Sequence, residues 1–139
     1  VQEKLNGAER GRRALIVFSD GEDNSSAHHL LDVMEAAQAT DTVIFSVHYA
    51  EKRDRVRGRN LYGKSVMARL AGDTGGAYME ATEDLKAAFK QIGDQMRSSY
   101  ELAYRSPATD RDGLFRKIQI RIAGRPEVKV RHRTGYYLR

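Results

Sequence analysis

The feature that most constrains this chain is an apolar run, residues 14–18, that ends abruptly in polar residues. The run, Ala-Leu-Ile-Val-Phe, shows no alternation of apolar and polar positions, which is typical of a strand buried on both faces of a parallel sheet. Directly after it come Ser19, Asp20, Glu22 and Asp23. In open α/β sheets, ligands bind at the carboxyl ends of the strands. These residues are therefore the first candidate site.

The three carboxylates of this stretch repel one another unless a cation, water or hydrogen-bond donors compensate their charge. Carboxylate and hydroxyl oxygens suit a hard cation such as Mg²⁺, Mn²⁺ or Ca²⁺. The alternative is a solvated loop between a strand and a helix, where Asp, Asn and Ser are also common because they form turns and cap helices. The residues alone leave both interpretations open.

The remaining apolar patterns predict an α/β fold with a mainly parallel sheet. A second buried strand is predicted at residues 42–49 and a short third strand at 77–80, each preceded by a helical pattern. Residues 51–64 lack an apolar period and are predicted to form a long loop, with a short helix at 65–71. Strands and helices in this order are typical of parallel strands joined by right-handed crossovers. A final helix carries a buried stripe formed by Leu85, Ala88, Phe89, Ile92 and Met96.

The periodicity changes to two from residue 100 onward. Apolar residues alternate with polar ones at Tyr100, Leu102 and Tyr104, at Ile118, Ile120 and Ile122, and at Val128 and Val130. This alternation predicts a small antiparallel unit with one solvated face. We therefore divide the chain into an α/β unit, residues 1–99, and an antiparallel β extension, residues 100–139, packed on the same domain.

Charge and composition narrow the classes of partner. The chain carries a formal net charge of +5 and, from Arg105 to its end, ten Lys and Arg against three Asp and Glu. Four of these basic residues, Lys117, Arg121, Lys129 and Arg131, fall on the polar positions of the alternating segments. They are therefore expected on a solvated sheet face, and no nucleic-acid partner is predicted. The sequence has no stretch apolar enough to span a membrane. It has no cysteine, which excludes disulfides and thiolate metal sites.

Several of these segments resemble von Willebrand factor type A (VWA) domains. Residues 13–23 are similar to the fourth strand and following loop of that family, and residues 70–78, Leu-Ala-Gly-Asp-Thr-Gly-Gly-Ala-Tyr, are similar to the stretch before its last strand. The helix at residues 85–96 fits the family's final helix. Residues 100–104 and 129–137 resemble a bacterial subgroup, the VWFA-related domains frequent in acidobacteria.

The resemblance implies a Rossmann-like, three-layer sheet. On this interpretation, residues 1–99 are the carboxyl-terminal half of a VWA-like domain and residues 100–139 are its β extension. The first three strands of the family, with their helices, have no counterpart here. A parallel sheet without that half exposes an apolar edge at residues 15–17. We therefore expect this edge to pair with the missing half of the domain or with a second copy of the chain.

The resemblance also implies a metal-ion-dependent adhesion site. In VWA domains this site combines an Asp-x-Ser-x-Ser loop, a threonine from a second loop and an aspartate after the fourth strand. Only the last has a counterpart here, Asp20, with Ser19, Glu22 and Asp23 as supporting neighbours. Hard cations take six or more oxygens. Mg²⁺, or Mn²⁺ or Ca²⁺, is therefore expected to bind only when the missing half completes the site.

The function implied by the resemblance is non-enzymatic protein binding or adhesion. The partner would supply an acidic side chain to the open coordination position, and the setting would be extracytoplasmic in a bacterium: secreted, periplasmic or in the cell envelope. Two alternatives stay open. One is a metal-dependent phosphohydrolase that uses the Asp20 loop, with Ser19, His28 and His48 as its candidate residues. The other is a structural scaffold whose metal site has decayed.

Overall fold

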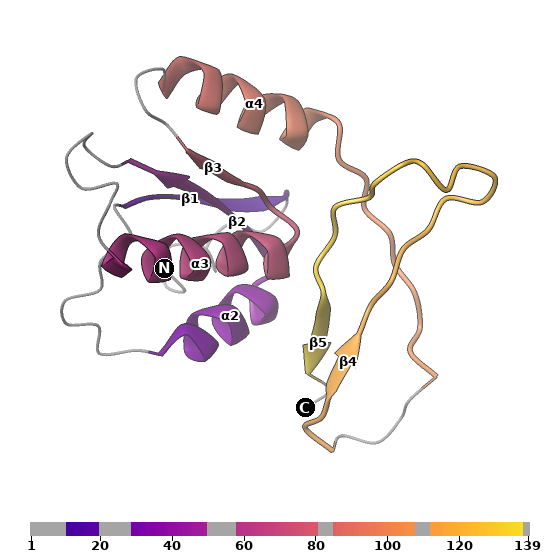
Figure 1. The fold of residues 1–139 in the computed structure, drawn as a ribbon. Coiled ribbons are helices and arrows are strands. Elements are labelled where there is room, and N and C mark those ends of the chain that lie inside the picture. The colour runs from indigo at the N-terminus through magenta and orange to yellow at the C-terminus, as the bar shows by residue number, and fades with distance from the viewer. Residues whose placement is uncertain (1–10, 20–28, 50–57, 81–84, 108–111, 138–139) are drawn as a thin grey trace.

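The computed structural model of this chain describes residues 11–19, 29–49, 58–80, 85–107 and 112–137 (Figure 1). Strands and helices alternate in its first part. They are β1 (Arg13–Ser19), α2 (Leu30–Ala39), β2 (Thr42–His48), α3 (Gly58–Thr74), β3 (Tyr78–Glu80) and α4 (Leu85–Arg97). Two short strands follow in the tail, β4 (Phe115–Lys117) and β5 (Gly135–Tyr137).

The first three strands form a parallel sheet in the order β1-β2-β3. β1 pairs with β2 along its full length, from Arg13 opposite Thr42 to Ser19 opposite His48. β2 pairs with β3 up to His48 opposite Glu80. β4 and β5 form a separate antiparallel pair. The predicted α/β fold is confirmed: a Rossmann-like parallel sheet interleaved with helices, followed by a two-stranded antiparallel sheet.

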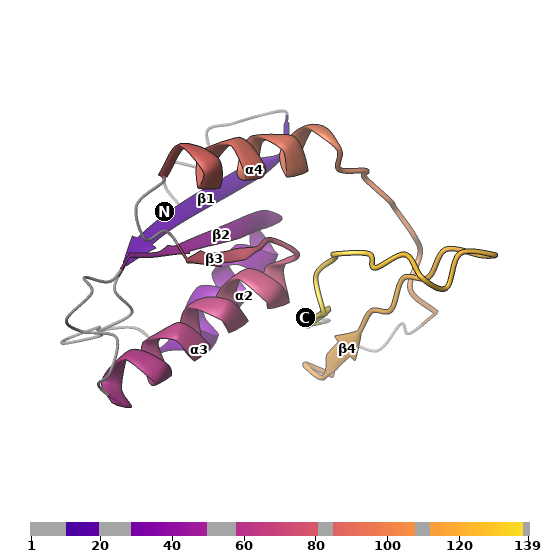
Figure 2. The same cartoon turned by 45° about the horizontal axis from the view of Figure 1, so that its top comes forward.

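Helices cover both faces of the parallel sheet. α4 lies over one face, and α2 and α3 lie over the other (Figures 1 and 2). Successive residues of a strand point to opposite faces, so every second residue of β2 packs beneath α4. The core on that face contains Phe45, Val47, Ala77 and Met79 of the sheet region with Ala88 and Ile92 of α4. On the opposite face, Ile44 is buried in the layer of α2 and α3, which bury Met34, Ala37, Met67 and Ala71.

Helix α3 is longer than its sequence pattern indicated. The prediction of a loop through residue 64 is wrong from residue 58 onward, because α3 runs from Gly58 to Thr74. Leu61 and Tyr62, in its first turns, are both exposed. An apolar period reveals a helix through the side chains that it buries, and these turns bury few. Residues 51–57, the rest of the predicted loop, lie outside the described part of the chain.

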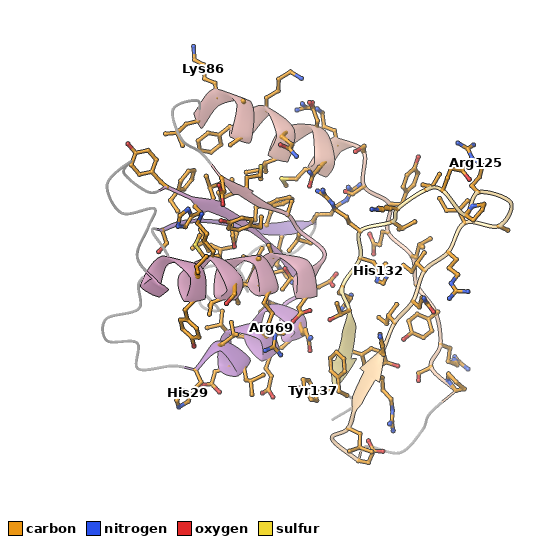
Figure 3. The ribbon with its side chains drawn as sticks, viewed as in Figure 1. His29, Arg69, Lys86, Arg125, His132 and Tyr137 are labelled. Carbon is orange, nitrogen blue, oxygen red and sulfur yellow. The ribbon has the colours of Figure 1, made fainter. Side chains whose placement is uncertain are left out.

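The tail contains less strand than its alternating pattern predicted. Between residues 112 and 137, its strands are limited to 115–117 and 135–137. The tail attaches to the α/β unit near the amino end of the sheet. There the Thr134 N–H donates to the Asp73 carbonyl at 3.1 Å, and the Thr134 hydroxyl lies 3.2 Å from Asp73 Oδ1. Arg133 also pairs with Asp41, one residue before β2. In Figure 3, Arg125 lies at the far loop of the tail and Tyr137 lies beside β4.

Candidate functional site

Polar side chains end all three strands of the parallel sheet. Ser19 ends β1, His48 ends β2 and Glu80 ends β3. The strand register pairs Ser19 with His48 and His48 with Glu80, so the three residues form a row that we call the strand-end row. Their place in the alternation puts all three on the face covered by α2 and α3. The Tyr49 N–H donates to the Ser19 carbonyl at 3.1 Å and extends the β1–β2 pairing to this edge.

Glu80 is the charged centre of the strand-end row. Its Oε1 accepts hydrogen bonds from Lys64 Nζ of α3, at 2.9 Å, and from the Tyr78 hydroxyl, at 3.2 Å. The hydrogen bond from Lys64 lowers the pKa of the Glu80 carboxyl below its ordinary value, and the nearby His48 contributes to this effect. Burial, together with the adjacent Glu80 charge, raises the pKa of Tyr78 to about 12. Glu80 is therefore ionised and Tyr78 protonated at neutral pH.

His48 lies below the surface of the site. It is 3% exposed, and its ring centroid is 6.3 Å from that of Tyr78. Ser46 points to the same face two residues earlier, and its fully buried hydroxyl has no hydrogen-bond partner within the described part of the chain. Polar groups therefore extend from the strand-end row into the layer between the sheet and α3.

A cavity of about 320 Å³ lies beside the strand-end row. It is bounded by β3 and α4, with Tyr78, Met79, Glu80, Ala87, Ala88 and Gln91 as its lining. Glu80 thus contributes both to the ion pair with Lys64 and to this cavity.

Of the residues predicted to bind a metal, Ser19 lies within the described part of the chain and the others lie outside it. Ser19 is the last residue of β1 and is partly buried. Asp20, Glu22 and Asp23 lie outside the described residues, as does His28. Among the residues that the structure describes, no group of three or more His, Asp or Glu side chains is placed to hold a metal ion. Because Mg²⁺ and Ca²⁺ take six or more oxygens, the described residues do not by themselves form a cation site.

Sequence reasoning identified Ser19 and His48 but missed Glu80, Lys64 and Tyr78. Periodicity indicates that a strand is present, and it does not indicate which strand ends lie side by side. One signal was available. Glu80 is the last residue of the predicted third strand, and the carboxyl ends of parallel strands share one edge of a sheet.

The Thr-Gly-Gly segment before β3, at the amino end of the sheet, fixes the position of β3 against β2. The Thr74 hydroxyl accepts a hydrogen bond from the Ile44 N–H of β2 at 2.9 Å. A Cβ at Gly76 would overlap the Ile44 carbonyl oxygen, and Gly75, at φ +87°, packs against the backbone of Arg133. The three residues therefore bring the end of α3, the start of β3 and the tail into contact. In this structure they position the strands.

The comparisons with known proteins do not identify a function for this chain. No protein-family model and no curated protein matches the sequence. One structural match is the crystal structure of an uncharacterized membrane-spanning protein from Vibrio fischeri, with 21% sequence identity and a TM-score of 0.49. The match covers 66% of this chain and 50% of that protein, so this chain spans about half its length. None of the helices in the described ranges combines the length and apolar character that crossing a bilayer requires.

Proposed function

We propose that this chain is part of a VWA-type protein-binding module whose partner contacts the carboxyl ends of the parallel strands. The observation that carries the proposal is the position of β1. It ends at Ser19, directly before Asp20, and within the described residues its hydrogen-bonded neighbour is β2 alone. A parallel strand added along the other edge of β1 would lie about 4.8 Å away. The loop that follows such a strand would then meet Ser19 and Asp20.

In this proposal the cation belongs to the completed domain. Asp20, with Ser19, Glu22 and Asp23 beside it, contributes oxygen ligands, and the added half contributes the rest. An acidic side chain of the partner occupies the open position, so binding requires Mg²⁺, Mn²⁺ or Ca²⁺. We infer an extracytoplasmic setting in a bacterium from the resemblance to VWFA-related domains. The proposal includes no catalytic step.

The test is thermal unfolding of two proteins, the 139-residue chain and the natural protein that contains it, with and without millimolar Mg²⁺ or Mn²⁺. We expect no change for the chain alone. We expect a higher midpoint for the natural protein, since a ligand at about 100 times its Kd stabilises the folded state by about 2.7 kcal/mol. Asp20→Ala should abolish the rise. Glu127→Gln, which removes a carboxylate of the tail, should keep it.

Two results would refute parts of the proposal. A metal-dependent rise in the 139-residue chain that Asp20→Ala removes would mean that this half binds the cation unaided. No rise in the natural protein would favour the scaffold alternative, in which the metal site has decayed.

The phosphohydrolase alternative has one observation in its favour, the register that pairs Ser19 with His48. Against it, His48 is 3% exposed and therefore poorly placed to reach a substrate. Hydrolysis of p-nitrophenyl phosphate that depends on Mg²⁺ or Mn²⁺ and is lost in Asp20→Ala would favour the enzyme over the binding module.

A further inference from the structure

The segment that follows α4 combines a strand-like sequence with a backbone that is unpaired within the described residues. Tyr100, Leu102 and Tyr104 alternate with Glu101, Ala103 and Arg105, and the first three are 91%, 71% and 61% exposed. The backbone groups of residues 100–105 make no hydrogen bond to the described part of the chain. A segment of this kind is a template for pairing with another strand.

We propose that residues 100–105 pair with the same residues of a second copy of this chain, as antiparallel strands related by a two-fold axis at Ala103. In this register Glu101 of each copy lies opposite Arg105 of the other, and Leu102 lies opposite Tyr104. Each of these pairs occurs twice because a two-fold interface is self-complementary. Opposite charges and apolar side chains placed directly across an antiparallel pair both stabilise it.

The charges select this register over its neighbours. A two-fold axis at Leu102 would place Glu101 opposite Ala103, and an axis between Leu102 and Ala103 would place Glu101 opposite Tyr104. In both arrangements Glu101 is no longer directly opposite Arg105. The axis at Ala103 therefore pairs both charges of the segment, and this complementarity is the reason to assign the surface to a second copy of the chain.

The side chain of Tyr104 contacts the tail. The Tyr104 ring packs edge-on against Tyr136, with centroids 6.3 Å apart. This contact anchors the apolar face of the segment while its backbone groups stay available. In the dimer, Leu102 of the second copy would lie beside Tyr104 and extend that apolar cluster.

The interface is small, so the dimer is expected to be reversible and concentration-dependent. Stable protein–protein interfaces bury about 1,200–2,000 Å², more than one short strand pair provides. The measurement should therefore be sedimentation equilibrium on the whole chain, from micromolar to near-millimolar concentration. For the parent we expect the mass to rise from 15.7 kDa toward twice that value.

Charge reversals test the register directly. Glu101→Arg places two arginines opposite each other, and Arg105→Glu places two glutamates opposite each other. Each should shift association to concentrations about tenfold higher or more, because like charges directly opposite destabilise a strand pair. The double variant should associate as the parent does. An equimolar mixture of the two single variants should form heterodimers, since both cross-strand pairs again join opposite charges.

Lys86→Glu is the matched control. It makes the same change in net charge as Arg105→Glu, and Lys86 lies on α4, away from the tail (Figure 3). It should leave association unchanged. A parent that is monomeric throughout, or a dimer indifferent to both single reversals, would overturn the proposal. Loss of association in the single variants without rescue in the mixture would overturn the register. The result is independent of the metal test, since neither Glu101 nor Arg105 is among the residues proposed to bind the cation.

Discussion

Replacing Thr74 with valine tests how the Thr-Gly-Gly segment holds the sheet together. The two side chains are close in shape, so the change removes the hydroxyl with little change in volume. The Ile44 N–H would lose its 2.9 Å acceptor at a place where both residues are buried. An unpaired buried donor costs about 1–3 kcal/mol. We therefore expect Thr74→Val to lower the free energy of unfolding by that amount, a large share of the roughly 5–15 kcal/mol typical of folded domains.

Urea unfolding followed by circular dichroism measures this loss. Thr74→Ser is the matched control, because it keeps the hydroxyl and removes one methyl group. It should cost about 0.8 kcal/mol or less. The reasoning is refuted if Thr74→Val unfolds within about 0.5 kcal/mol of the parent, the range of ordinary surface substitutions. It is also refuted if the serine variant loses as much stability as the valine variant, since packing of the methyl group would then be the cause.

Two further substitutions probe the two ends of β3, Gly76 before its first residue and Glu80 at its last. Gly76→Ala should lower the free energy of unfolding by about 3 kcal/mol or more in the same urea assay, because the added Cβ overlaps the Ile44 carbonyl oxygen. Gly72→Ala is the control and should be neutral or stabilising, because a Cβ there meets nothing within 4 Å. Equal losses of stability in the two variants would contradict this account. Glu80→Gln should reduce stability at about pH 7 by at most about 1 kcal/mol, since its ion pair with Lys64 is partly exposed. The pKa of Glu80 is lowered from 4.5 in the folded state, so its contribution is present above that pH and is lost as the pH falls through the folded value. The free energies of unfolding of the parent and of Glu80→Gln should therefore converge as the solution becomes acidic. A difference between them that stays constant with pH would be inconsistent with an ionised Glu80.

The arrangement of the sheet could be predicted from sequence because β1 and β2 are continuous runs of apolar or small residues, 14–18 and 43–47. β2 is largely buried between the helix layers, whereas β1 is only half-buried and Phe18 is exposed. The same reasoning failed where burial is slight. Leu61 and Tyr62, near the start of α3, are exposed, and within the described part of the tail the alternating segments form strands only at 115–117 and 135–137. An alternating pattern shows which side chains are apolar, but it does not show whether a neighbouring strand is present to form hydrogen bonds.

Only those parts of the candidate site that depend on a single strand could be predicted from the sequence. Ser19 and His48 follow apolar runs, so their position at strand ends could be inferred from each strand alone. The contact between Glu80 and Lys64 joins residues sixteen positions apart, and it depends on the close approach of Gly76 to β2 that sets the register of β3. That approach involves backbone atoms, which composition and periodicity do not describe. The contribution of Asp20, Glu22 and Asp23 stays a prediction, because they lie outside the described residues.

The position of the tail has a mechanical consequence. Arg133 and Thr134 attach the tail near the amino ends of the strands, whereas the strand-end row lies at their carboxyl ends. A pull between a partner held at the strand-end row and an anchor on the tail would therefore run along the strand axes. A pull that entered at Ser19 of β1 and left through Asp41, directly before β2, would shear β1 against β2. It would load the bonds of all seven register pairs together, whereas peeling would break them one by one. A domain attached in this way resists tension best along the line that joins its two ends.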